Sequence, residues 1–281
     1  MFATANSRYA ARFSLPGPRD RPAGVGRVLR GFTLLVCVLF CVASLADDTN
    51  NVSPSPLVIK SNFAARVGRE FQESRVRFLA NNNNATNAWQ FGRACFDLAE
   101  LATNNATKAE VAEQGIAACR RSVALESNSA PAHYYLGMTI GQLADTKRNM
   151  AALKMVKEME REFMAARELD APFDFAGANR NLGLLYLDAP TIISIGSRSK
   201  ARSHLQRAVE LAPEFPENHL NLIETLLKWS DYEAARRALK ALEKIWPEAE
   251  KQFPGDAWAV NWLDWEKRLN AAKKKIAANT K

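Results

Sequence analysis

The chain has 281 residues, of which 47% are hydrophobic, with few Gly and Pro. This composition excludes fibrous, low-complexity and disordered classes and allows one or two ordered domains. The formal net charge is +8, but six of the 38 basic residues and one of the 30 acidic residues lie before residue 47, which leaves +3 on the remainder. A nearly balanced surface offers no electrostatic footprint for nucleic acid.

Residues 1–46 are predicted to be a secretory signal peptide. Arg30 immediately precedes an uncharged apolar run that extends from Gly31 to Leu45. The run is shorter than the roughly 20 residues that a membrane-spanning helix needs. It ends with small residues at Ser44 and Ala46, which suit signal peptidase. We expect cleavage after Ala46, contact with the membrane only during export, and a periplasmic or secreted mature protein.

The mature chain is predicted to begin with a linker. Residues 47–61 are rich in Asp, Asn, Ser and Pro and hold too few apolar residues to offset the entropy cost of ordering. Helical periodicity then starts, because Phe63, Val67, Phe71 and Phe78 fall on roughly one face at 3.6 residues per turn. We predict one helical domain over residues 62–272 and a basic tail over residues 273–281.

A repeat near the C-terminus indicates the architecture. The residues Ala201, Leu205, Leu211 and Pro213 recur 34 positions later as Ala235, Leu239, Ile245 and Pro247. This period is typical of tetratricopeptide repeats (TPR), in which stacked helical hairpins bury a continuous core. The fold class is therefore all-α, a right-handed superhelix of about four hairpins with a leading helix and a C-terminal capping helix.

Small and large residues alternate in these hairpins as close helix packing requires. Gly137 and Gly183 are predicted to let paired helices approach, and larger residues fill the space between hairpins. The final helix carries Trp258, Trp262, Trp265 and Leu269 on one face, which predicts a cap over the core. Two insertions depart from the repeat: residues 146–156 are expected to lengthen a helix, and residues 188–199 to form a loop.

No constellation of residues predicts catalysis, a metal or a cofactor. The three histidines are interpreted as structural, since His133 and His219 occupy equivalent repeat positions. The segment Gly196 to Lys200 contains a helix-capping serine pattern and lacks the glycines of a P-loop. Cys95 and Cys119 lie on neighbouring helices of one hairpin, and either a disulfide or two buried free thiols fits this placement. The protein is predicted not to be an enzyme.

The concave groove of the superhelix is the predicted binding site. It would be largely apolar with one cation, which suits an apolar or amphipathic guest. The alternative is that the C-terminal helix folds back over some of these residues. The predicted lining consists of Tyr134, Met138, Arg180, Leu184, Leu187, Leu220, Glu224 and Leu227.

Several longer motifs go beyond the generic spacing of the repeat: Ala94 to Ala99, Ala112 to Ile116, His133 to Gly137, Asn181 to Tyr186 with Asp188-Ala189-Pro190, Gly196 to Lys200, and Pro216-Glu217-Asn218. Together these motifs resemble the TatT-type family, the periplasmic TPR component of some tripartite ATP-independent periplasmic (TRAP) transporters. The resemblance extends from Phe71 to Leu269 and implies a helical periplasmic protein that holds a hydrophobic ligand and docks with a TRAP solute-binding protein. An envelope scaffold without a small-molecule ligand is the second hypothesis.

Overall fold

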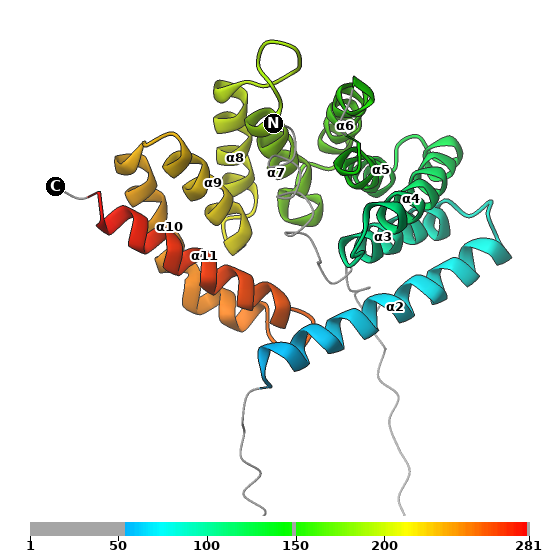
Figure 1. The fold of residues 1–281 in the computed structure, drawn as a ribbon, viewed down its shortest axis with the longest axis horizontal. Helices are drawn as coiled ribbons and strands as arrows, with labels where there is room; N and C mark the ends of the chain where they lie inside the picture. Colours follow the sequence, from blue (N-terminus) through cyan, green and yellow to red (C-terminus); the bar gives the residue numbers. More distant parts are fainter. Residues whose placement is uncertain (1–53, 148–149, 280–281) are drawn as a thin grey trace, which may run out of the picture.

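The computed structural model describes residues 54–147 and 150–279, so the predicted signal peptide and residues 47–53 lie outside the described residues. All regular elements of the described ranges are helices (Figure 1). They are α2 (Pro56–Ala80), α3 (Ala85–Glu100), α4 (Asn105–Leu125), α5 (Ala130–Asp145), α6 (Met150–Leu169), α7 (Phe173–Asp188), α8 (Arg198–Leu211), α9 (Pro216–Lys228), α10 (Tyr232–Gln252) and α11 (Ala259–Ala277).

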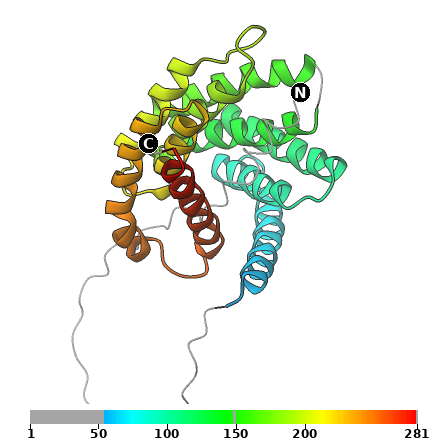
Figure 2. The same cartoon turned by 60° about the vertical axis from the view of Figure 1, so that its left-hand side comes forward.

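The helices pack as hairpins in chain order. The pairs α3 with α4, α5 with α6, α7 with α8, and α9 with α10 make extensive contacts, and α3, α5, α7 and α9 also contact one another in series. The hairpins form a curved array (Figures 1 and 2). The predicted all-α, TPR-like superhelix of helical hairpins is confirmed, with α2 as the leading helix and α11 as the cap.

The two additional helices close the array. α2 and α11 lie at its opposite ends and meet each other (Figure 1). The Arg66 guanidinium donates hydrogen bonds to the carbonyl oxygens of Asp256 and Ala257, each 3.4 Å long. In α11, Trp265 is fully buried and Trp258 and Leu269 are nearly so, which agrees with the predicted capping role of the tryptophan stripe.

Glycines set the approach of paired helices at the predicted positions. A Cβ atom added to Gly137 would lie 2.7 Å from the Phe163 ring, and one added to Gly183 would lie 2.6 Å from Cγ of Leu205. Contacts this short leave no room for a side chain. The repeat pattern therefore identified real packing positions, and the residue that faces Gly183 across the helix pair is Leu205.

The structure corrects two predicted boundaries. α2 begins at Pro56, inside the predicted linker, because a proline in the first turn of a helix loses no hydrogen bond and Ser55 takes the extended conformation of an N-cap. α11 continues to Ala277, inside the predicted basic tail, because Ile276 is buried and Lys273 forms an ion pair of 2.9 Å with Glu243. Residues 280 and 281 lie outside the described part.

The loop insertion is found where the repeat pattern placed it. α6 has 20 residues and α4 and α10 have 21 each, so the length of α6 does not distinguish it as the lengthened helix that residues 146–156 predicted. Residues 189–197 form a loop between α7 and α8. Within the described ranges, no helix combines the length and the apolar character that crossing a bilayer requires.

Candidate functional site

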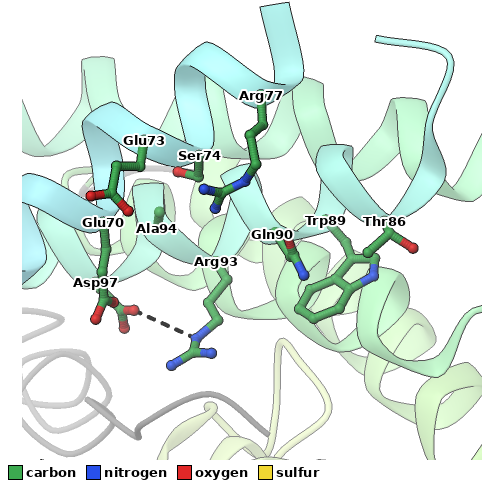
Figure 3. A pocket seen from close by; sticks show the side chains of 10 residues that line it. All are labelled: Glu70, Glu73, Ser74, Arg77, Thr86, Trp89, Gln90, Arg93, Ala94 and Asp97. Atoms are coloured by element: carbon green, nitrogen blue, oxygen red, sulfur yellow. Dashed lines mark ion pairs between the residues drawn. The ribbon is translucent and has the colours of Figure 1, made fainter. Parts of the chain in front are cut away.

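A cavity of about 380 Å³ lies between α2 and α3 (Figure 3). α2 contributes three charged side chains and a serine, and α3 contributes an indole, an amide and a further ion pair. Its lining consists of Glu70, Glu73, Ser74, Arg77, Thr86, Trp89, Gln90, Arg93, Ala94 and Asp97.

Helical periodicity places these side chains on the cavity. α3 starts at Asn84, whose side chain accepts a hydrogen bond from the Asn87 amide and caps the helix. Trp89, Arg93 and Asp97 then follow at intervals of four, so they share one face of the helix. The helix buries a different face, rich in Ala, Phe and Cys, against the core. The cavity is thus a polar stripe on a helix whose other sides are apolar.

Charge is segregated along the cavity. Figure 3 shows the carboxylates of Glu70, Glu73 and Asp97 at one end and Trp89 towards the other, with the guanidinium groups of Arg77 and Arg93 between them. A ligand that spans the cavity therefore meets an acidic end, a basic middle and an aromatic end. This sequence of environments suits a polar molecule with charges of both signs and does not suit a purely apolar guest.

Among the groups that line the cavity, Asp97 has a strongly shifted pKa. Its residue is only 5% exposed, and burial raises the pKa of its carboxyl to about 7, against the opposing effect of the Arg93 guanidinium. Arg93 Nε lies 3.7 Å from Asp97 Oδ2, and its guanidinium also lies over the ring of Tyr135 at 5.9 Å. Trp89 stacks nearly parallel on the same ring, with a centroid distance of 5.9 Å. Tyr135 of α5 therefore supports both the aromatic and the basic part of the cavity.

A left-handed turn adjoins this site. Asp174, Phe175 and Ala176 have φ values of 53°, 53° and 59°, which non-glycine residues rarely adopt. Arg180 and Asn218 both donate to the Phe175 carbonyl oxygen at 3.0 Å. Strained backbone persists only where its surroundings determine it, and it gathers at functional sites.

The turn positions the carboxylate of Asp174 near the α3 face. Asp174 Oδ2 accepts hydrogen bonds from Tyr134 Oη at 2.6 Å and from Arg180 at 2.9 Å. Burial raises the pKa of Asp174, and the Arg180 guanidinium opposes the rise. A separate void of only about 10 Å³ is lined by Asp174 together with Arg93 and Asp97 of the cavity. The turn supports the site and leaves little space of its own.

The predicted groove lining is placed differently from the expectation. Arg180 is completely buried, and its guanidinium binds Asp174, Phe175 and Asn218, so it is a structural clamp on the turn and not a cation that faces a ligand. Leu187 and Glu224 are half-buried. The others lie in the core: Tyr134, Met138, Leu184, Leu220 and Leu227.

α11 covers this surface at the C-terminal end, which is the alternative that the sequence left open. Arg268 Nη1 lies 2.7 Å from Glu217 Oε2, and Arg268 Nε lies 2.7 Å from Glu224 Oε1. Trp265 Nε1 donates a hydrogen bond of 2.8 Å to Glu217. These contacts bind α11 to α9, so Glu224 pairs within the chain. The α9 residues of the predicted lining are consequently buried, as Leu220 and Leu227 are, or paired, as Glu224 is.

Cys95 and Cys119, which lie in the described part of the chain, are buried free thiols. Burial raises the pKa of Cys95 to about 12 and raises that of Cys119 as well, so both are protonated and unreactive at neutral pH. The structure therefore has no Cys95 to Cys119 disulfide. Each sulfur side chain instead packs against the facing helix, where Cys119 Sγ would lie 2.1 Å from a Cβ atom added to Gly92.

The histidines make local structural contacts. His133 and His219 donate from Nε2 to the carbonyl oxygens of Ser127 and Pro213, six residues earlier in each case. His204 hydrogen-bonds to Asn179 across α7 and α8. In the described ranges, no group of three or more His, Cys, Asp or Glu side chains is placed to hold a metal ion.

The cavity was not predicted from the sequence, and no role was expected for Trp89, Arg93 or Asp97. The available signal was an i, i+4 ion pair, 3.7 Å long in the structure, that continues the register of Trp89 on an otherwise apolar helix. The contribution of Arg77 from α2 had no local signal, because it depends on how two helices cross.

Comparison with protein families adds one match in this region. A family model described as Regulator of microtubule dynamics protein 1-3 matches residues 67–175, less than half of the chain. The matched segment runs from α2 to the beginning of α7 and contains every residue that lines the cavity. No curated protein matches the chain.

Solved structures of TPR proteins match this chain. A thermophilic TPR protein of Thermus thermophilus, TTC0263, superposes with a TM-score of 0.55 at 16% sequence identity, covering 78% of this chain and 96% of that one. YrrB, described as a TPR protein with an unusual peptide-binding site, has a TM-score of 0.43 at 17% identity, covering 72% of this chain and 90% of its own. The first likeness establishes the TPR-like fold of this chain.

Proposed function

We propose that this protein is a non-catalytic TPR interaction module that binds a polar segment of a partner protein in the cavity between α2 and α3. The observation that carries the proposal is the ordered lining of the cavity. Acidic side chains lie at one end, Arg77 and Arg93 in the middle, and Trp89 at the other end. A peptide segment offers cationic, anionic and aliphatic groups at matching intervals, together with a backbone that hydrogen-bonds to Gln90.

Arg77 and Trp89 are expected to contribute to binding energy in different ways. Arg77 is exposed and makes no ion pair within the described part of the chain, so a carboxylate of the partner gains a charge-assisted contact without displacing another. Trp89 is already held against Tyr135, so little side-chain entropy is lost when it receives a guest. Trp and Arg are also the residues that most often dominate binding at protein interfaces.

Selection of random peptides displayed on phage, carried out on the full chain, tests the proposal. We expect the selected peptides to carry both a basic and an acidic residue. In fluorescence polarisation, Trp89→Ala and Arg77→Glu should each weaken their binding by about tenfold or more. Arg207→Glu, on the exposed surface of α8, is the matched control and should bind as the wild type does.

Circular dichroism of each variant confirms that the fold is kept. Peptides that bind the Trp89 and Arg77 variants as tightly as the wild type would show that the cavity is not the binding site. A selection that yields no binding peptide would likewise contradict the proposal.

The finer expectations from the sequence are export and docking with a TRAP solute-binding protein, and both stay predictions. The proteins named above do not include a TRAP component. Capture of an amphipathic small molecule is poorly supported, because Arg180, the cation expected to bind its charged group, is buried and bound to Asp174. The scaffold hypothesis therefore agrees better with the geometry.

A further inference from the structure

A second exposed feature lies far from the cavity, at the loop between α7 and α8. Ile192 and Ile193 at its tip are 95% and 57% exposed. The loop projects beyond the helices, at the top of Figure 1, whereas α2 runs along the bottom. Single exposed apolar residues are ordinary, but two adjacent isoleucines at the tip of a projecting loop form a concentrated apolar contact surface.

Backbone contacts fix the base of this loop. The Gly196 amide donates to the Pro190 carbonyl oxygen at 3.3 Å, and the Ser197 amide donates to that of Tyr186 at 2.9 Å. A Cβ atom on Gly196 would lie 2.0 Å from the Ala189 carbonyl oxygen, so glycine permits the close approach. The closed base and Ile195, which packs against the core, leave residues 191–193 exposed, so the exposure of Ile192 and Ile193 is a property of the fold.

Uncompensated cations lie at the base of the loop. Arg198 and Lys200 are exposed on the first turn of α8, and within the described part of the chain neither forms an ion pair with a carboxylate. Each lies over an aromatic ring instead: Arg198 over Trp229 at 4.7 Å and Lys200 over Tyr186 at 4.8 Å. The next cation along the helix, Arg202, is paired with Asp231. The uncompensated positive charge at this end of α8 therefore lies close to the loop.

We propose that residues 189–200 dock this protein on a membrane surface that carries anionic lipids. Ile192 and Ile193 enter the interface between headgroups and acyl chains, while Arg198 and Lys200 contact the anionic headgroups. Apolar side chains beside cations and a tryptophan are the composition of segments that lie in membrane interfaces. An apolar pocket of a protein would accept the isoleucines, but the adjacent unpaired cations favour an anionic surface.

The arrangement leaves the proposed peptide site accessible. The loop and α2 lie on opposite sides of the molecule in Figure 1, so docking through the loop turns the α2 side away from the membrane. The membrane contact does not depend on the peptide proposal, since the two share no residue.

Hydrogen–deuterium exchange of the full chain, with and without lipid vesicles, tests the inference at the loop itself. We expect vesicles of phosphatidylcholine and phosphatidylserine to slow amide exchange in residues 189–200, and vesicles of phosphatidylcholine alone to do so much less. In vesicle titrations with the same readout, Ile192→Ser combined with Ile193→Ser should weaken loop docking by about tenfold or more. Arg198→Gln combined with Lys200→Gln should remove the preference for phosphatidylserine.

The matched control is Val76→Ser combined with Leu79→Ser, which removes two apolar residues of α2 that are 65% and 66% exposed. This variant should keep the protection of the loop. Amide exchange of the loop that vesicles leave unchanged would overturn the proposal. The proposal would also be overturned if the control variant lost as much loop protection as the isoleucine variant. The loop could instead contact a second copy of this chain, and sedimentation velocity tests this alternative. A dimer that is lost only in the isoleucine variant would show that a second copy binds the loop.

Discussion

The two ends of the hairpin array use an additional helix in opposite ways. At the N-terminal end α2 lies beside α3 and leaves a charged cavity of about 380 Å³. At the C-terminal end α11 lies against α9 and leaves its polar groups paired within the chain. Both surfaces carry arginine and glutamate, so the kinds of residue do not distinguish an open site from a closed one.

The two ends differ in how deeply their charged side chains are buried and in how many charged partners each of them has. Arg268 is 8% exposed and contacts Glu217, Glu224 and Asp264, whereas Arg77 is exposed and has no carboxylate partner in the described ranges. A buried ion needs several partners to offset its lost hydration, while an exposed one keeps its water until a ligand arrives. A binding site in this fold is therefore expected where the charges are exposed and incompletely paired.

Among the variants that test this difference between the two ends, removal of Arg268 should have the largest effect on the free energy of unfolding. Arg268→Ala leaves the buried carboxylate of Glu217 without its cation, and we expect the free energy of unfolding in urea to fall by about 3 to 5 kcal/mol. Arg77→Ala is the counterpart at the open end and should change it by less than about 0.5 kcal/mol. Similar losses for both variants would show that the two ends do not differ as described.

Packing between the hairpin helices gives the next largest effect. Gly183→Ala places a Cβ atom 2.6 Å from Cγ of Leu205 and should cost about 1 to 3 kcal/mol. Gly68→Ala in α2 meets nothing within 4 Å and should stabilise the helix by about 0.5 to 1 kcal/mol. Thermal melts monitored by circular dichroism should shift in opposite directions, and a common direction would contradict the packing at one of the two positions.

The open end should also respond to pH through Asp97. Burial raises its pKa from an ordinary 3.8 to about 7; Glu70 and Asp174 add to the rise, and Arg93 opposes it. Between these values the folded state binds more protons than the unfolded state, so stability falls as pH rises from about 4 to about 7, by at most about 1.4 kcal/mol per pH unit. Asp97→Asn should flatten this part of the urea-unfolding profile; an unchanged slope would exclude Asp97 as its source.

A turn at the closed end gives the smallest predicted effect. Ser230 has a φ of 60° after the end of α9, where the Asp231 amide donates to the Leu226 carbonyl oxygen in a pattern that usually contains glycine. Ser230→Gly should raise the free energy of unfolding by roughly 0.5 to 1 kcal/mol, because glycine adopts this conformation without strain. Calorimetry measures the shift, and a lower melting temperature would mean that the serine is favoured there.

The architecture was accessible from the sequence. The 34-residue repeat, the small residues Gly137 and Gly183, and the tryptophan stripe of α11 are local patterns, and local periodicity determines which face of a helix is apolar. The same information placed the loop after α7, because an insertion into a repeat has to emerge from the stack.

The location of an open site was decided only by the tertiary structure. Periodicity placed Arg180 on an inward face, but its burial depends on a left-handed turn and on Asn218, which is 38 residues away. Arg268, which covers the surface of α9, follows its partner Glu217 by 51 residues in the sequence. The cavity at Trp89 arises where α2 crosses α3. Burial and pairing of charges depend on such distant contacts, which sequence spacing alone does not specify.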